Sequence, residues 1–443
     1  MRIALVNTNR IRPAVAPIGL DYIAEALNAS GHQVRILDLS WTGDPQAAIS
    51  AFCSPQDVDL VGITLRNTDD CDFGTRRSFV GEFVETVHTI REHTGAKIIL
   101  GGAGFSVMPK PVLDACGADF GVWADGEFAF PELANRLEQE RPWHDIPDLI
   151  WPDQGAWHHN PSAVLSLASL PRMSRGWVDN RRYLQEGEPV GIETKRGCPG
   201  KCIYCADPIA KGKQTRPRDP RTVVEEIETL LEQGIDHLQT CDSEFNLPEW
   251  HALETCREIL GRKIGHKVRW QAMCSPSPFS AQLAQLMRRA GCVGVNFGVD
   301  SGDEGMLKRL KRGFGPEDIL NAVDCCRKEG IEVMVDLLIG GPGETRETIA
   351  STLELMKRAQ PDKVNVALGI RIYPGTELAR LVERGPLAAG VIGGPDPDQP
   401  LFFVEPEVAP FASEMLDTFV SDAYERKVRM RRAAHQALLR GLR

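Results

Sequence analysis

The sequence reads Lys195-Arg196-Gly197-Cys198-Pro199-Gly200-Lys201-Cys202-Ile203-Tyr204-Cys205 near its middle, and the three cysteines of this stretch are its most informative feature. Thiolates spaced C-x3-C-x2-C can each bind a different iron of a 4Fe–4S cluster, which leaves the fourth iron open to a small molecule. Zinc is an alternative, but structural zinc uses four ligands and no fourth Cys or His lies nearby. A redox-active C-x2-C pair is another alternative, and it leaves Cys198 unexplained. The spacing therefore favours a cluster bound by Cys198, Cys202 and Cys205.

Strands and helices alternate regularly after this stretch. From Pro189 onward the pattern predicts strand–helix units of roughly 35 residues each. Six such units suit a parallel barrel, complete or partial, whose chemistry gathers on the loops after the carboxyl ends of the strands. The cysteines lie on the loop after the first strand. The predicted strands are Pro189–Thr194, His237–Cys241, Val268–Met273, Val293–Val299, Glu332–Leu338 and Val364–Ile370.

The first 140 residues alternate in the same way and predict a doubly wound, Rossmann-like α/β domain. Helical periodicity is clear in Ile18–Ala29 and in Phe79–His93, and a glycine suited to a helix C-cap follows each. Ligands of such sheets lie beyond the carboxyl ends of the strands, where this sequence is polar or rich in glycine. The predicted strands are Arg2–Val6, Gln33–Leu37, Leu60–Thr64, Lys97–Leu100 and Phe120–Trp123.

The chain is thus expected to have four parts. Residues 1–140 form the Rossmann-like domain, and residues 186–385 form a partial (β/α)6 barrel. Residues 141–185 are rich in Pro, Trp and His without a clear period, so they are predicted to be a surface linker with one short hairpin. Residues 386–443 are predicted to be a C-terminal extension that is largely helical.

Composition narrows the classes of function. Apolar residues make up 42% of the 443 residues and charged residues 25%, which is normal for a globular protein. The net charge of −10 argues against nucleic-acid binding, which usually leaves a basic footprint. We expect no membrane span, because no apolar stretch reaches about 18 residues. The N-terminal segment does not resemble a signal peptide, so a cytoplasmic location is expected.

The cysteine motif, at the head of such a barrel, resembles the radical S-adenosylmethionine superfamily. The resemblance covers about residues 189–380. Asp242-Ser243-Glu244-Phe245-Asn246 is similar to the stretch that meets the amino group of the methionine moiety. Gly298-Val299-Asp300-Ser301-Gly302 stands where the family places residues that contact ribose and carboxylate. Leu338-Ile339-Gly340-Gly341-Pro342-Gly343-Glu344-Thr345 resembles the Gly-Pro-Gly-Glu-Thr signature, and Tyr373-Pro374-Gly375-Thr376 resembles the segment closing the sixth unit.

This resemblance implies that S-adenosylmethionine binds the open iron through its amine and carboxylate. It implies that Glu244 accepts from the ammonium group and that Asp300 or Ser301 hydrogen-bonds ribose or carboxylate. A surface carboxylate is the alternative for Glu244, and a helix N-cap is the alternative for the other two. Lys195 and Arg196 either stabilise the anionic cluster or are solvated. The implied cofactor-binding residues of the barrel are Tyr204, Asp242, Glu244, Asp300, Ser301 and Gly340.

The N-terminal domain has landmarks of its own, namely Pro17-Ile18-Gly19-Leu20-Asp21, Asp59-Leu60-Val61-Gly62-Ile63-Thr64, Gly101-Gly102 and Ala124-Asp125-Gly126-Glu127. Together they resemble the cobalamin-binding domain that precedes the barrel in one large branch of the superfamily. The cobalt-ligating signature Asp-x-His-x-x-Gly is absent, and that branch usually lacks it too. The resemblance implies cobalamin between the two domains, with Thr64, Gly101 and Gly102 near its ring or nucleotide tail. A degenerate module kept for folding is the alternative.

The stretch Leu65-Arg66-Asn67 looks like that of a tryptophan C-methylase branch, in which an arginine occupies the lower face of cobalt without ligating it. The resemblance implies that Leu65 and Arg66 contact cobalamin. It also implies that Arg66 is a catalytic residue, because a cation there discourages axial coordination. An arginine that caps a helix or binds the phosphate of the tail is the alternative.

The combined resemblance implies a cobalamin-dependent C-methyltransferase that acts on a small molecule or natural product, with an electron donor of the flavodoxin or ferredoxin type. With Arg66 below cobalt, methyl transfer can be polar and need no adenosyl radical. Rearrangement, ring contraction or cyclisation without methylation is one alternative, and a non-catalytic iron–sulfur or cobalamin sensor is another. Tyr373 is predicted as a second catalytic residue. The residues expected at the substrate pocket are Trp270, Gln271, Asn296, Asp336, Arg371 and Tyr373.

Overall fold

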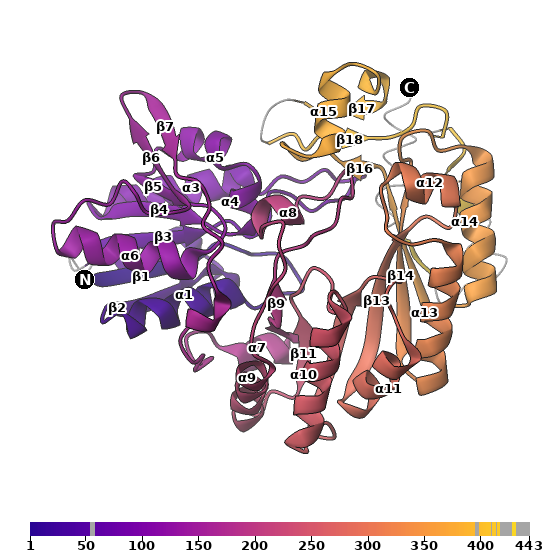
Figure 1. Cartoon of the computed structure of the whole chain (residues 1–443). Coiled ribbons are helices and arrows are strands. Elements are labelled where there is room, and N and C mark those ends of the chain that lie inside the picture. Colours follow the sequence, from indigo (N-terminus) through magenta and orange to yellow (C-terminus); the bar gives the residue numbers. More distant parts are fainter. Residues whose placement is uncertain (54–57, 395–397, 409, 413, 417–427, 431–443) are drawn as a thin grey trace.

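The computed structural model describes residues 1–53, 58–394, 398–408, 410–412, 414–416 and 428–430 (Figure 1). Two large sheets dominate it, one built from the N-terminal part of the chain and one from the C-terminal part. In Figure 1 they lie on opposite sides of the molecule, with β9 (Lys195–Arg196) and α8 (Asp207–Ala210) between them. None of the helices in the described part has the length and apolar character of a membrane span.

The first sheet has the strand order β2-β1-β3-β4-β5-β6-β7, and its first five strands are parallel. This order confirms the predicted doubly wound domain, and its switch point falls between β1 and β3, where ligands of such sheets bind. There Thr8 Oγ1 donates to the carbonyl of Thr64 at 2.7 Å, so the loops after β1 and β3 meet. The parallel strands are β1 (Arg2–Asn7), β2 (Gln33–Asp38), β3 (Leu60–Thr64), β4 (Lys97–Gly101) and β5 (Phe120–Val122).

Helices cover both faces of this sheet, because successive strand residues point to opposite sides. In β1, Ala4 and Val6 belong to one buried cluster, whereas Ile3 and Leu5 belong to the other. The first cluster includes α2 (Pro45–Cys53), α3 (Val80–His93), α4 (Ala103–Val107) and α5 (Pro109–Cys116). The second includes α1 (Ile18–Ala29) and α6 (Gly126–Glu138).

The prediction of a surface linker over residues 141–185 was wrong in one respect. Its hairpin, β6 (Leu149–Asp153) and β7 (Ala156–His159), pairs antiparallel with β5 and extends the sheet. Leu149 and Ile150 are buried, one on each face of the sheet. The local pattern indicated a hairpin, but its pairing partner lies about 30 residues earlier, beyond the reach of a local pattern.

The second sheet contains the six predicted barrel strands in the order β15-β14-β13-β12-β11-β8, all parallel. Within β14, Val333 and Val335 are buried in the core, whereas the half-buried Asp336 lines a cavity inside the barrel. The strands are β8 (Val190–Ile192), β11 (His237–Thr240), β12 (Arg269–Cys274), β13 (Cys292–Asp300), β14 (Glu332–Ile339) and β15 (Lys363–Leu368). The outer helices are α9 (Pro220–Glu232), α10 (Glu249–Gly261), α11 (Ala281–Arg289), α13 (Pro316–Glu329) and α14 (Arg346–Ala359).

The C-terminal extension contains strands that its prediction as a largely helical segment missed. β17 (Val391–Ile392) and β18 (Phe402–Phe403) pair antiparallel, and β18 also pairs with β16 (Ile370–Arg371). The backbone of β19 (Val428–Met430) pairs parallel with β15. The rest of the prediction falls on residues 417–427 and 431–443, which lie outside the described residues.

A buried cluster of charges joins the two domains. Arg175, fully buried, donates to the Asp21 carboxylate on α1 at 2.7 Å and to Glu226 on α9 at 2.8 Å. Glu226 also pairs with Arg218 at 2.7 Å and accepts from the hydroxyl of Tyr22 at 2.8 Å. The segment that carries Arg175 therefore connects the first domain to the barrel as part of their interface.

We expect Arg175→Ala to lower the free energy of unfolding by about 3–5 kcal/mol, because it leaves the buried Asp21 carboxylate without its cation and Glu226 with Arg218 as its one remaining cation. Arg257→Ala is the matched control, since Arg257 pairs with Glu254 on the surface, and it should cost less than about 1 kcal/mol. Urea unfolding followed by tryptophan fluorescence measures both variants. Equal midpoints for Arg175→Ala and the wild type would show that this cluster does not hold the domains together.

Candidate active site

The cysteine loop begins where β8 ends and folds back on itself through backbone contacts. β9 pairs with β10 (Arg216–Pro217), and the Cys198 amide donates to the carbonyl of Gly212 at 3.0 Å. Gly197 has φ +92°, and a Cβ there would lie 2.0 Å from the carbonyl oxygen of Gln214, so only glycine fits this turn. The strand end and the glycine together fix where the three cysteines start.

Two of the thiols converge on one side of the loop. A Cβ at Gly200 would lie 3.1 Å from Cys198 Sγ and 3.9 Å from Cys202 Sγ. Among the described residues, no three His, Cys, Asp or Glu side chains are arranged around a single metal ion. A cubane binds each thiolate to a different iron, and the free thiols of Cys198, Cys202 and Cys205 on one short loop fit that requirement.

Arg312 lies beside the cysteine loop and was not predicted. Its Nη1 donates to Cys202 Sγ at 3.1 Å and to the Tyr204 hydroxyl at 3.2 Å, while its Nε lies 3.3 Å from Asp300 Oδ2. Burial raises the pKa of the Cys202 thiol and the Arg312 charge opposes that rise. A guanidinium at this position favours thiolate and would stabilise an anionic cluster. Arg312 follows α12 (Glu304–Arg309) in no recognisable motif, so the sequence carried no signal for it.

Glu244 is a desolvated carboxylate beside this group. Burial raises its pKa to about 7, against the lowering effect of Arg312 and with Asp300 adding to the rise. Within the described residues its side chain forms neither a hydrogen bond nor an ion pair. A buried carboxylate without a partner is suited to bind a cation such as an ammonium group.

The carboxyl edge of the first sheet encloses an N-terminal cavity of about 180 Å³, lined by Thr64, Gly101 and Gly102 and by Arg196 and Lys211 from the barrel. Gly102 has φ +102°, and a Cβ there would lie 2.5 Å from both the carbonyl oxygen of Leu65 and Thr64 Oγ1. Glycine is therefore required, and its backbone is open to a ligand from the cavity side. The cavity and the glycine cradle fit a ligand that reaches into the first domain, as the nucleotide tail of cobalamin would.

A central cavity of about 490 Å³ lies between the domains. Arg66 of the first domain lines it together with Tyr204, Cys205, Asp300 and Tyr373 of the barrel. Burial lowers the pKa of the Arg66 guanidinium, and its Nη1 donates to Asn67 Oδ1 at 3.2 Å. In the described part of the chain no carboxylate pairs with Arg66, so its positive charge is available to the cavity.

Comparisons with known proteins agree with this arrangement. The radical SAM superfamily model matches residues 192–356, and the B12 binding domain model matches residues 5–134. Tryptophan 2-C-methyltransferase of Streptomyces laurentii is 33% identical over 441 residues, which cover 85% of this chain and 74% of that protein.

Two solved structures of the radical S-adenosylmethionine methyltransferase TsrM from Kitasatospora setae superpose with a TM-score of 0.88. The one with cobalamin and a 4Fe–4S cluster bound is 29% identical, and the match covers 96% of this chain and 92% of that chain. The one with tryptophan substrate and the analogue aza-SAM is 30% identical and covers 96% and 90%.

The chain belongs to the cobalamin-dependent radical S-adenosylmethionine methyltransferases. It is an enzyme whose cofactors are a 4Fe–4S cluster, S-adenosylmethionine and cobalamin, and its substrate is a small molecule. The fold class inferred from the sequence is thereby confirmed.

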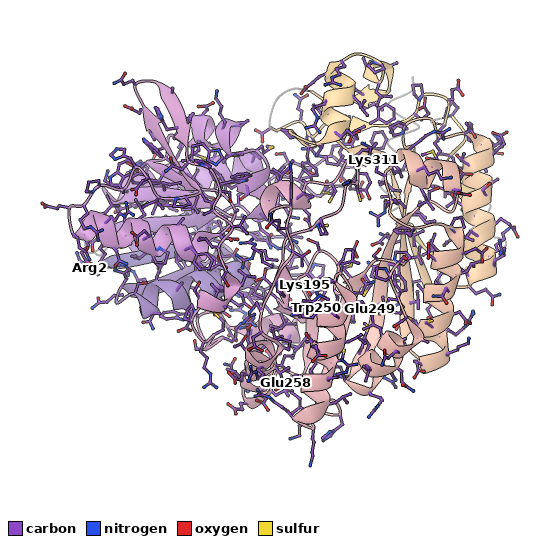
Figure 2. The ribbon with its side chains drawn as sticks, in the orientation of Figure 1. Arg2, Lys195, Glu249, Trp250, Glu258 and Lys311 are labelled. Carbon is purple, nitrogen blue, oxygen red and sulfur yellow. The ribbon has the colours of Figure 1, made fainter. Side chains whose placement is uncertain are left out.

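Several residues that were predicted to bind a cofactor form hydrogen bonds or ion pairs that hold the fold of this methyltransferase. The Asp242 carboxylate accepts from the amides of Thr194 and Lys195 at 2.8 and 3.2 Å and pairs with Lys195 Nζ at 3.1 Å. It therefore clamps the start of the cysteine loop. Lys195 lies near the centre of the molecule (Figure 2), buried against Asp242, so it is not solvated as one alternative had it.

Ser301, Gly340 and Leu65 are not among the residues that line either cavity. Ser301 Oγ contacts Thr352 Oγ1 at 3.0 Å in the core, whereas its neighbour Asp300 lines the central cavity. The Gly340 amide donates to the buried Glu344 carboxylate, which fixes the turn after β14. The side chain of Leu65 packs in the core of the first domain, so only its backbone lies near Gly102.

Of the residues expected at a substrate pocket, Asp336, Arg371 and Tyr373 line the central cavity. Trp270 does not, because its ring is buried and its Nε1 donates to the carbonyl of Ala290 at 2.9 Å. Gln271 and Asn296 are not part of the cavity lining either, although Asn296 Nδ2 donates to Asp336 at 2.7 Å.

We expect Cys202→Ala, purified without oxygen and reconstituted, to lose most of its iron and sulfide, because it removes one of three cluster ligands. Cys325→Ala is the control, since Cys325 is buried on α13, far along the chain from the loop. Iron and sulfide quantitation with the visible absorption spectrum measures both. A Cys202→Ala protein that kept a full 4Fe–4S spectrum would contradict the assignment.

Proposed function

We propose that this enzyme transfers a methyl group to a carbon atom of an indole-bearing amino acid, with tryptophan as the first candidate. The names of the relatives support it, since one methylates tryptophan at C2 and another was solved with tryptophan as substrate. The central cavity of about 490 Å³ is in the size range of small-molecule sites. Its position between Arg66 and the cysteine loop is the observation that carries the proposal.

We infer that Arg66 would lie against the cobalt of bound cobalamin as a catalytic residue. When bound, S-adenosylmethionine and cobalamin would supply the methyl-transfer chemistry. The desolvated guanidinium would not ligate the metal itself, because it offers donors and no lone pair. Its placement on the cavity wall, next to the glycine cradle at Gly102, supports this role.

The barrel residues hold the cluster and the methyl donor in this proposal. Cys198, Cys202 and Cys205 bind the cluster. Glu244 accepts from the ammonium group, which its raised pKa and lack of a partner support. Asp300, fixed by Arg312 and by the hydroxyl of Tyr204, is aimed at the same cavity.

Two further features belong to the proposal. Methyl transfer would be polar, because the guanidinium of Arg66 has no lone pair with which to ligate the cobalt of bound cobalamin. A small electron-transfer protein of the flavodoxin or ferredoxin type supplies the electrons that keep the cofactors reduced. The proposal of net methylation excludes rearrangement or ring contraction, because these leave the number of carbon atoms unchanged.

We expect the anaerobically reconstituted enzyme, given a reductant, S-adenosylmethionine and tryptophan, to form a product one methylene heavier with an equal amount of S-adenosylhomocysteine. Mass spectrometry of tryptophan, the methylated product, S-adenosylhomocysteine and 5′-deoxyadenosine measures this. An unchanged carbon count would contradict the proposal, and 5′-deoxyadenosine in proportion to product would contradict the polar step.

We expect Arg66→Gln to lower turnover about 100-fold, in the range found when a preorganised charge is removed, with iron content unchanged. Arg77→Gln is the matched control, because Arg77 lies on the same loop but forms a surface pair with Glu82. Initial rates and the spectrum of bound cobalamin measure both variants. If Arg66→Gln and Arg77→Gln changed turnover equally, Arg66 would have no part in the proposed mechanism.

A further inference from the structure

Residues 65–79, the loop from β3 to α3, cross from the first domain to the barrel. Phe73 on this loop is buried in the core cluster of the barrel, with its ring edge-on to Phe402 at 5.7 Å between centroids. Gly369, after β15, lies against the Phe73 ring, and a Cβ there would come within 3.2 Å of it. The loop is thus anchored in the second domain by an apolar side chain.

A buried ion pair aligns the same loop with the central cavity. Arg371 Nε pairs with Asp69 Oδ2 at 2.9 Å, and the side chains are 10% and 1% exposed. Asp69 Oδ1 accepts from the backbone amide of Cys71 at 3.0 Å. The guanidinium carbon of Arg371 also lies 4.6 Å from the centre of the Tyr373 ring. One carboxylate and one guanidinium therefore orient a residue from each domain.

These two residues meet at the wall of the central cavity. Cys71 Sγ lies 2.9 Å from the hydroxyl oxygen of Tyr373, and both residues line the cavity with Arg66. Burial raises the pKa of the Cys71 thiol to about 11, with Asp69 adding to the rise. Cys71 is therefore a neutral thiol at neutral pH, so it can serve as donor or acceptor to the Tyr373 hydroxyl.

The Tyr373 hydroxyl can accept a further hydrogen bond in either arrangement of this pair. Its oxygen has two lone pairs, and the thiol of Cys71 can occupy at most one of them as a donor. At least one lone pair is therefore left for a donor in the cavity. The indole nitrogen carries an N–H and has no lone pair in the plane of its ring. It complements such an oxygen because it donates a hydrogen bond and accepts none.

We propose that Tyr373, held by Cys71 across the domain interface, is the substrate-binding residue that accepts the indole N–H. This rests on the proposed function and names the contact by which the same site selects an indole ring. It also means that the contact is complete only when the first domain and the barrel are docked, since each contributes one half of the pair.

Binding of two probes to the reconstituted holoenzyme tests this contact. One probe is L-tryptophan and the other is 3-(benzothiophen-3-yl)alanine, in which sulfur replaces the indole N–H with little change in shape. The dissociation constants are measured by calorimetry for the wild type, Tyr373→Phe and Cys71→Ser. Tyr183→Phe is the control, because the substitution removes a buried hydroxyl that donates to Asp38 away from the central cavity.

The wild type should bind tryptophan about tenfold more tightly than the sulfur analogue, the size of one hydrogen bond. Tyr373→Phe should bind both probes equally, and Cys71→Ser, which keeps an acceptor, should retain most of the discrimination. Tyr183→Phe should match the wild type. Tryptophan should also slow the alkylation of Cys71 by iodoacetamide, read by mass spectrometry of its peptide.

The outcomes separate the inference from the proposed function. If the wild type methylates tryptophan and Tyr373→Phe still prefers it over the analogue, the contact is wrong and the function stands. If the wild type binds neither probe, both the indole substrate and this contact are overturned. Equal weakening of both probes by Tyr373→Phe would assign Tyr373 a structural role and would also overturn the inference.

Discussion

The position of the active site depends on the buried ion pairs of two residues, Lys195 and Arg196, that lie just before the cysteines. Lys195 is tied to Asp242 within the barrel, and Arg196 pairs at 2.8 Å with Asp125 and Glu127 of the first domain. Two neighbouring residues thus anchor the cysteine loop to both domains. Charges removed from water are costly unless they are well paired, so this arrangement is specific to one docking of the domains.

Because that docking is fixed, groups from both domains share one enclosed space. Arg66 comes from the edge of the first sheet, Tyr204 from the cysteine loop, and Asp300 from the carboxyl end of β13. Arg312 then links Asp300 to Cys202, so the cysteine loop and the cavity wall form one hydrogen-bonded unit. The chemistry of a methyl donor, a cluster and a corrin requires such proximity, which neither domain provides alone.

Patterns that depend on neighbouring residues were predicted well. The strands and the helices α1 and α3 lie where the periodicity placed them, because burial of one face repeats along a short segment. The spacing of the three cysteines predicted a 4Fe–4S cofactor, which the comparisons confirm, whereas their role as its ligands stays a prediction. The resemblance of their loops to family motifs predicted that Asp300, Tyr204 and Tyr373 lie at the site, and all three line the central cavity. The roles of these residues remain proposals.

What the sequence determined by itself was the order of elements and the chemistry carried by the cysteine loop, since both are local. Only the tertiary structure decided which of two adjacent residues faces the cavity. Asp300 lines the cavity and Ser301 does not. Asp242 is paired with Lys195, whereas Glu244, two residues later, has no side-chain partner among the residues that the structure describes. The pairing of Cys71 with Tyr373 and the addition of the β6–β7 hairpin to the first sheet also needed it. Side-chain direction and long-range pairing are set by how distant segments pack, and no local pattern records that packing.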